Sequence, residues 1–140
     1  MLGSHCVKTW STNQQVIALS SGEAEYYGLV KGATIAIGIR SMLSDFGIEC
    51  RIVMCTDASA AKGIASRRGL GKVRHIELCQ LWLQDKVAND EIRIVKIAGA
   101  DNFSDSLTKP ASAERINQTL YHTSQVCAEG RHAIMPRVAA

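Results

Sequence analysis

The amino-acid sequence predicts an α/β domain, and three observations lead to this prediction. Two short apolar segments, residues 51–56 and 91–97, have the length and composition of buried strands. Helical patterns lie between them, so a right-handed parallel crossover is the expected connection. A longer amphipathic pattern over residues 20–46 precedes both strands and supplies an apolar helix face that can cover a sheet.

The helix over residues 20–46 has sequence signals at both ends. Ser20 and Glu23 form a capping-box pattern at its start, and Gly47 suits the position just past its end. Its predicted apolar face repeats every three or four residues and comprises Leu29, Ala33, Ala36, Ile39, Leu43 and Phe46. The helix also contains three interior glycines, Gly28, Gly32 and Gly38. Each costs about 1 kcal/mol relative to alanine, which we expect close packing on the sheet to offset.

The remaining elements are shorter. They are strand-like pieces at residues 6–10 and 16–19, and helices at 58–66, 74–87, 101–109 and 111–130. Pro110 ends the helix before it, and residues 131–140 have the pattern of a loose tail. We therefore expect one domain over residues 1–110, followed by a C-terminal helix and tail over residues 111–140.

Composition narrows the class of protein. A chain of 140 residues with ordinary hydrophobic content can bury one core, and a net charge of +3 is too small to indicate a partner by itself. The five cysteines and four histidines show no metal-ligand spacing. We expect the cysteines to be small buried residues of an intracellular protein, in the cytoplasm or the nucleus. No apolar run reaches the length of a membrane span, so no membrane partner is expected.

Basic residues gather in one segment of this nearly neutral chain. No acidic residue occurs between Asp57 and Glu77, and the basic residues in that gap are Lys62, Arg67, Arg68, Lys72 and Arg74. Two interpretations fit the segment equally well. It is either a solvated loop or a nucleic-acid-binding segment whose charges neutralise backbone phosphates.

Three acidic residues, Glu25, Asp57 and Asp105, lie at the ends of predicted elements. Asp57 directly follows the first buried strand, so it either caps the next helix or reaches into a site at the carboxyl edge of the sheet. Glu25 precedes Leu29 by four residues and is expected to point toward the sheet, the alternative being an exposed first-turn acid. Asp105 falls in the first turn of the helix after the second strand, where an acid is also favourable for the helix itself.

If the three carboxylates converge on one sheet edge, they predict a metal site. Carboxylates gathered closely raise each other's pKa unless a cation compensates their charge. Oxygen ligands without a nearby His or Cys favour Mg²⁺, with Mn²⁺ as the substitute. Two such ions about 4 Å apart activate a water molecule and stabilise the leaving oxygen in phosphodiester hydrolysis.

Three motifs occur in order along the chain. They are LSSGEAEYYGLVKGA, CTDASAAKGIASRRGLGKVRHIELCQLWLQDKV and ADNFSDSLTKP, and they lie within a resemblance that covers about residues 6–110. They resemble the ribonuclease H domain of copia-type retrotransposon Pol polyproteins. The resemblance implies a ribonuclease H-like mixed sheet flanked by helices, and two-magnesium hydrolysis of the RNA strand in an RNA/DNA hybrid. It matches Glu25, Asp57 and Asp105 to catalytic, metal-binding carboxylates of that family.

The chain departs from the family pattern near its N-terminus. The family's first catalytic aspartate lies on an opening strand, whereas no acidic residue precedes Glu23 here. The resemblance therefore implies that the first strand or strands are missing and that the isolated chain is weak or inactive. It also implies an upstream reverse transcriptase portion as the neighbour in a polyprotein. Either the N-terminal segment fills the place of the missing strand, or the sheet edge is left open for self-association.

Two functional hypotheses follow. The first is a metal-dependent ribonuclease H that cleaves the RNA of a hybrid. The alternative is a non-catalytic retroelement remnant that acts as a nucleic-acid-binding or interaction module through the basic segment. An integrase-like or junction-resolving nuclease of the same superfamily fits less well, because the helix residue Glu25 precedes the strand-end residue Asp57.

Overall fold

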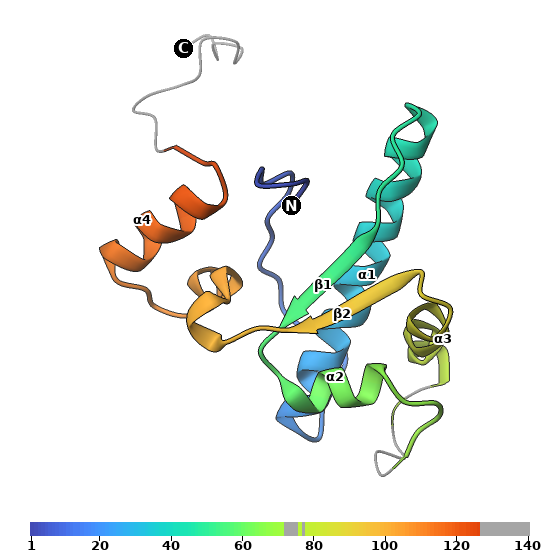
Figure 1. Cartoon of the computed structure of the whole chain (residues 1–140). Helices are drawn as coiled ribbons and strands as arrows, with labels where there is room; N and C mark the ends of the chain where they lie inside the picture. The colour runs from blue at the N-terminus through green and yellow to red at the C-terminus, as the bar shows by residue number, and fades with distance from the viewer. Residues whose placement is uncertain (72–75, 77, 127–140) are drawn as a thin grey trace, which may run out of the picture. The chain divides into compact units, whose positions relative to one another are not determined.

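Figure 1 shows the fold of the chain as a computed structural model, which describes residues 1–71, 76 and 78–126. These residues divide into two compact units, one over Asn13–Asn102 and one that joins Met1–Thr12 to the residues from Phe103 onward. Within the described residues, no helix is both long enough and apolar enough to cross a membrane.

The unit over Asn13–Asn102 confirms the predicted α/β class. In chain order its elements are α1 (Ser21–Asp45), β1 (Ile52–Thr56), α2 (Ser59–Ala65), η1 (Leu78–Gln80), α3 (Trp82–Ala88), β2 (Ile92–Lys96) and η2 (Gly99–Asp101). Helices accompany a small two-stranded parallel sheet, an arrangement consistent with a ribonuclease H-like fold with missing strands. The two predicted buried strands are thus confirmed, as is their parallel pairing.

The sheet has one buried face and one open face. The register runs from Ile52 opposite Ile92 to Thr56 opposite Lys96, so side chains of paired residues share a face. Ile52 and Ile92 are buried, whereas the side chain of Val53 on the opposite face is 55% exposed. The sheet is therefore covered on one side only.

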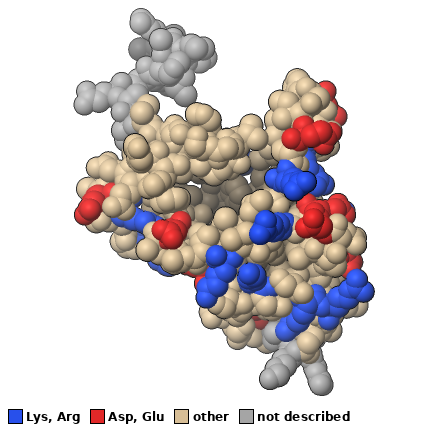
Figure 2. Space-filling model, in the orientation of Figure 1, with Lys and Arg blue, Asp and Glu red and all other residues tan. Residues whose placement is uncertain are grey.

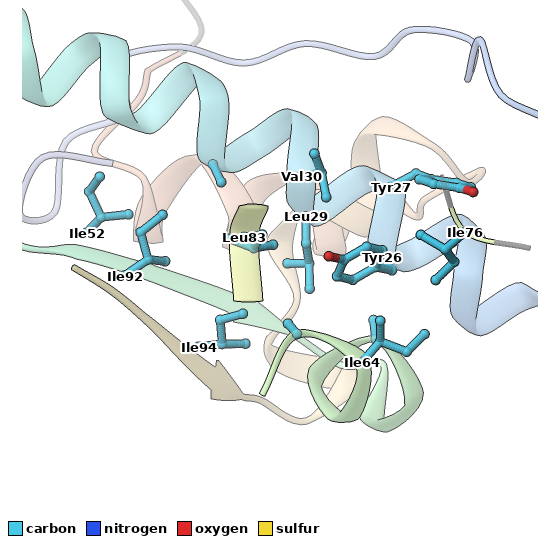
Figure 3. Packing of buried hydrophobic residues seen from close by; sticks show 13 residues of the cluster. Tyr26, Tyr27, Leu29, Val30, Ile52, Ile64, Ile76, Leu83, Ile92 and Ile94 are labelled. Atoms are coloured by element: carbon cyan, nitrogen blue, oxygen red, sulfur yellow. The ribbon is translucent and has the colours of Figure 1, made fainter. Parts of the chain in front are cut away.

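The first half of α1 covers the buried face of the sheet. Its buried apolar residues are Tyr26, Tyr27, Leu29, Val30 and Ala33. In Figure 3, Tyr26 and Leu29 of α1 extend toward Ile94 of β2 and Ile64 of α2, and Leu83 of α3 belongs to the same cluster. The hydrophobic core thus lies between α1, the sheet and the two short helices.

The predicted apolar face of α1 is wrong at its far end, where Phe46, the C-cap residue, is 74% exposed. The reason is length. A helix of 25 residues spans about 37 Å, whereas a strand of five residues spans only about 17 Å. The sheet cannot reach the end of the helix.

Both predicted caps of α1 are present. The hydroxyl of Ser20 accepts a hydrogen bond from the Glu23 N–H at 3.2 Å. At the other end Gly47 has φ +76°, and its N–H and that of Ile48 donate to the carbonyl oxygens of Ser44 and Leu43. This Schellman arrangement satisfies the last carbonyls of the helix.

The glycines of α1 differ in their packing. A Cβ added at Gly22 would lie 2.6 Å from the Cβ of Ala60, so α1 and α2 touch there. A Cβ at Gly32 would lie 3.2 Å from the Met54 Cε, whereas Gly28 and Gly38 face open space. Close packing therefore accounts for Gly32 among the three predicted interior glycines and not for the other two.

Several shorter elements differ from their predictions. Residues 6–10 and 16–19 form no strand, because no neighbouring strand pairs with them within the described residues. The predicted helix over 101–109 consists instead of the end of η2 and a second 3₁₀ turn, η3 (Phe103–Leu107). The predicted helix over 74–87 begins as η1 and becomes α-helical only at Trp82, while residues 72–75 and 77 lie outside the described part.

The predicted burial of the cysteines is wrong, because none of the four described ones is fully buried. Cys55 and Cys79 are exposed, and Cys6 and Cys50 are half-buried. Cys55 lies on the open face of the sheet, which explains its exposure. The fifth cysteine, Cys127, lies outside the described residues.

The second unit is built around α4 (Ala113–His122), which the hydroxyl of Ser112 caps. The ring of Phe103 stacks on that of His122 with centroids 4.9 Å apart, and the guanidinium of Arg115 lies 5.4 Å from the Phe103 centroid. The predicted helix after Pro110 is thus present but shorter. Residues 127–130 of that predicted helix and the whole predicted tail, residues 131–140, lie outside the described part.

The glycines of α1 give a matched pair of stability predictions. Gly22→Ala should lower the free energy of unfolding, because the new Cβ would press against Ala60 of α2. Gly28→Ala should raise it by up to about 1 kcal/mol, because the site is open and alanine has the higher helix propensity. Urea denaturation followed by circular dichroism measures both. Equal effects of the two changes would contradict the close helix contact at Gly22.

Tyr26 makes stability depend on pH at the alkaline end. Its hydroxyl donates to the Gln80 carbonyl oxygen at 2.7 Å, and burial raises its pKa from 10.0 to about 12, with Arg67 opposing the rise. Below pH 10 the stabilising contribution of the neutral phenol is complete. It is lost as the pH rises toward 12, because the unfolded chain releases this proton first. Urea unfolding at increasing pH should show this decline, and Tyr26→Phe should reduce it.

Candidate carboxylate site and basic loop

Asp57 lies at the carboxyl end of β1 and does not cap the following helix. The N-cap of α2 is Ala58, which has no side-chain capping bond, and its N–H is instead bound by the Thr56 hydroxyl at 3.1 Å. The interpretation of Asp57 as a helix cap is therefore wrong. Its half-buried carboxylate makes no hydrogen bond or ion pair with any residue that the structure describes.

The carboxylate of Asp57 points toward the turn that follows β2. A Cβ built on Gly99 would lie 3.7 Å from the Asp57 Oδ2. Lys96, the last residue of β2, donates a hydrogen bond from its Nζ to the hydroxyl of Ser59 at the start of α2. The carboxyl ends of both strands thus bring an acid, a base and a hydroxyl to one edge of the sheet.

Glu25 does not point toward the sheet as predicted, because its side chain is exposed to solvent. The buried acid of this helix is Glu23, which is 1% exposed. Its Oε2 accepts from the Leu19 N–H at 2.9 Å and its Oε1 from the Tyr27 hydroxyl at 2.8 Å. Glu23 thus ties the chain before α1 to the helix, while Glu25 remains available to solvent at the same end.

Asp105 lies in η3, in the second unit. Its Oδ2 forms an ion pair with the Nζ of Lys109 at 2.8 Å. The structure therefore does not place Asp105 in one compact unit with Glu25 and Asp57, and the convergence of the three acids stays a prediction. Asp101, which the sequence reasoning passed over, lies in η2 within the unit of Asp57 and follows β2 more closely.

The described carboxylates do not by themselves make a metal site. Among the residues that the structure describes, no group of three or more His, Cys, Asp or Glu side chains is placed to hold a metal ion. The oxygen donors are of the kind that Mg²⁺ and Mn²⁺ prefer, but their number at the Asp57 edge falls short of a resident site.

The loop that follows α2, residues 66–71, carries Arg67 and Arg68 and is called the basic loop below. One buried side-chain amide, that of Gln84, holds it in place. The Gln84 side chain is 4% exposed, and its Oε1 accepts from the Gly69 N–H at 2.8 Å. Its Nε2 donates to the carbonyl oxygens of Ile64 and Gly69 at 2.9 and 3.1 Å. These bonds satisfy the backbone of the turn at Gly69, where φ is +78°, and fix the loop on α3.

The predicted phosphate-binding residues occupy different environments. Arg67 turns into its own loop, because its guanidinium donates to the Leu70 carbonyl oxygen at 2.6 Å and lies against Gly71. Its Nε is buried and has no hydrogen-bond partner among the described residues. Because the guanidinium is turned inward onto the loop backbone, this side chain is a structural part of the loop. Arg68 is exposed and Lys62 is half-buried on α2. Lys72 and Arg74 lie outside the described residues.

The basic side chains visible in Figure 2 do not form one continuous stripe. On the face shown in Figure 2, basic side chains form several separate groups with acidic side chains among them. Any binding of nucleic acid on this face must therefore depend on a few local residues rather than on a continuous basic surface.

The chain is similar in sequence to retrotransposon Pol polyproteins. It is 28% identical over 114 residues to the retrovirus-related Pol polyprotein from transposon RE2 of Arabidopsis thaliana, and 27% identical over 114 residues to that from transposon RE1. It is 26% identical over 104 residues to the retrovirus-related Pol polyprotein from transposon TNT 1-94 of Nicotiana tabacum.

These alignments cover 72 to 79% of the chain but only 8% of each relative. No family model and no solved structure matches the chain. The similarity therefore supports a region of a retrotransposon Pol polyprotein, and the chain spans a small part of the length of these relatives.

Proposed function

We propose that the chain is the ribonuclease H portion of a copia-type retrotransposon Pol polyprotein, which acts on the RNA strand of an RNA/DNA hybrid. The observation that carries the proposal is Asp57, a strand-end carboxylate that is neither a helix cap nor part of an ion pair among the described residues. The sequence similarity of this chain to retrotransposon Pol polyproteins also supports the proposal.

The proposal also assigns roles to the groups around Asp57. Lys96 and Ser59 fix the ends of β2 and α2 beside it, which keeps the carboxylate at the edge of the sheet. Lys62, which is half-buried, and Arg68, which is exposed, follow along the chain, and their proposed role is to contact phosphates of the hybrid. Mg²⁺, or Mn²⁺ in its place, is the proposed cofactor, and when bound it would supply an activated water.

Cleavage should require more carboxylates near Asp57 than the isolated chain provides. Since the described residues gather no group of three metal-binding side chains, we expect the isolated chain to cleave weakly or not at all. A strand added upstream, bearing a further aspartate, is the expected remedy. The reverse transcriptase portion of the polyprotein is the proposed source of that strand.

A non-catalytic nucleic-acid-binding or interaction module is the second candidate. Two observations favour it, namely the incomplete carboxylate set and the exposed Arg68 on a loop that Gln84 holds in place. This candidate requires hybrid or single-strand binding that depends on the basic loop and is independent of Asp57.

The decisive experiment is cleavage of a labelled RNA strand in an RNA/DNA hybrid with Mg²⁺ or Mn²⁺. The chain extended upstream through the preceding Pol segment should cleave, and Asp57→Asn should reduce its rate by at least roughly a hundredfold, the loss that even outer-shell partners of metal ligands can cause. Asp45→Asn, at the exposed end of α1, is the matched control and should change nothing. Equal rates for the extended chain and its Asp57→Asn variant would exclude the proposed ribonuclease H.

The two arginines of the basic loop should differ in binding assays. Arg68→Ala should weaken hybrid binding and lower the slope of log K against log salt by about 1, because it removes one phosphate contact without touching the fold. Arg67→Ala should chiefly lower the free energy of unfolding, because its guanidinium closes the loop. Arg40→Ala, on α1, removes the same charge elsewhere and serves as the control. An unchanged salt slope for Arg68→Ala would exclude that contact.

A further inference from the structure

The free edge of β1 carries unused hydrogen-bonding groups. Within the described part of the chain, β1 pairs with β2 alone. The Thr56 carbonyl oxygen accepts from the Ile97 N–H at 2.9 Å, so Thr56 faces β2. In a parallel ladder, alternate residues direct both backbone groups to the same neighbour. The N–H and C=O groups of Val53 and Cys55 therefore point to the open edge.

The open edge has none of the features that usually prevent strand pairing. The strand Ile52–Thr56 contains no charged residue and no proline. Val53 is 55% exposed and Cys55 is exposed, so its outer face is also apolar and uncovered. Natural edge strands commonly carry lysine, proline or a bulge, because a flat apolar edge recruits other strands. Figure 1 shows β1 with a paired strand on one side only.

We propose that this edge binds β1 of a second copy of the chain, in antiparallel register about a two-fold axis at Met54. Full overlap of Ile52–Thr56 with its own copy requires Met54 to lie opposite the partner's Met54, and Val53 opposite the partner's Cys55. The two sheets would then join into one continuous four-stranded sheet.

The register agrees with the direction of the backbone groups. In antiparallel pairing, residues that exchange two hydrogen bonds must both point to the shared edge. Val53 and the partner's Cys55 meet this condition, as do Cys55 and the partner's Val53. Met54 points toward β2 and falls on the non-hydrogen-bonded pair at the axis. A shift of one residue would place an outward residue opposite an inward one and break the ladder.

The charges beside the strand favour the same register. Arg51 precedes β1 and Asp57 follows it, and neither forms an ion pair with a described residue. With Met54 at the axis, Arg51 lies opposite the partner's Asp57 at one end of the pair, and Asp57 lies opposite the partner's Arg51 at the other. A parallel arrangement would instead bring like charges together at both ends. Cross-strand pairs of opposite charge stabilise a sheet and like pairs destabilise it.

A charge exchange tests the proposal by sedimentation of the full chain over a range of concentrations. The wild-type chain should form a dimer. Arg51→Asp and Asp57→Arg should each weaken the dimer by about tenfold, since each creates two like-charge pairs. The double variant Arg51→Asp with Asp57→Arg should restore it, because the pairs are re-formed with reversed signs. A wild-type monomer at all concentrations, or a dimer that the single variants leave unchanged, would overturn the proposal.

Disulfide cross-linking tests the register of the two β1 strands directly and does not depend on charge. Val53→Cys places a thiol opposite the partner's Cys55, at the Cα separation of about 5.5 Å that suits a disulfide. Mild oxidation should give a covalent dimer of this variant on a non-reducing gel. Arg93→Cys is the matched control, because it exposes a thiol on the same face but on β2, away from the shared edge. Equal cross-linking of the two variants would exclude this register.

Both tests are independent of the proposed ribonuclease H function, because the oligomeric state is measured without nucleic acid or metal. The edge could instead be filled by residues 6–19 of the same chain. That occupant would leave the chain monomeric in the sedimentation experiment, which would overturn the proposal.

Discussion

The burial of the first half of α1 is the constraint on which the α/β unit depends. Two strands of five residues cannot form a stable sheet alone, and a helix packed on one face is what makes such a sheet viable. Tyr26 and Val30 bring the helix onto the other core elements, and Gly22 lets α2 approach to contact distance. The buried Glu23 carboxylate, bound by Tyr27 and the preceding backbone, fixes where the helix begins.

Local signals predicted most of the fold, and long-range packing decided the rest. The caps of α1 and the two strands follow from residues adjacent in sequence, so the pattern identified them. The orientation of Glu25 does not follow from residues adjacent in sequence. Extending the apolar stripe back from Leu29 assumed that the sheet alone covers the helix, whereas α2 and residues before Ser20 also cover its first turns. Their contact turns the buried face toward Glu23 and leaves Glu25 in solvent.

The candidate site shows the same division between local and long-range information. Asp57 could be predicted because the end of a buried strand is visible in sequence, and the structure places it at the sheet edge without a capping role. Charge counting could not show that Arg67 turns inward onto Gly71, since that depends on the positive φ of the loop glycines and on Gln84. The i,i+4 spacing of Asp105 and Lys109 indicates their ion pair, but no local signal showed that Asp105 belongs to a different compact unit from Asp57.

The proposed site and the proposed dimer compete for one carboxylate. In the proposed dimer the partner's Arg51 would lie beside the Asp57 carboxylate, which in the proposed nuclease would instead bind a metal ion. A strand inserted along the free edge of β1 would displace the partner's β1 and release Asp57 at the same time. If that strand also carries an aspartate, it adds a ligand beside the one that it frees. The proposed dimer and the proposed nuclease would then be two alternative ways to pair the free edge of β1. Insertion of one added strand would dissociate the dimer and complete the nuclease site.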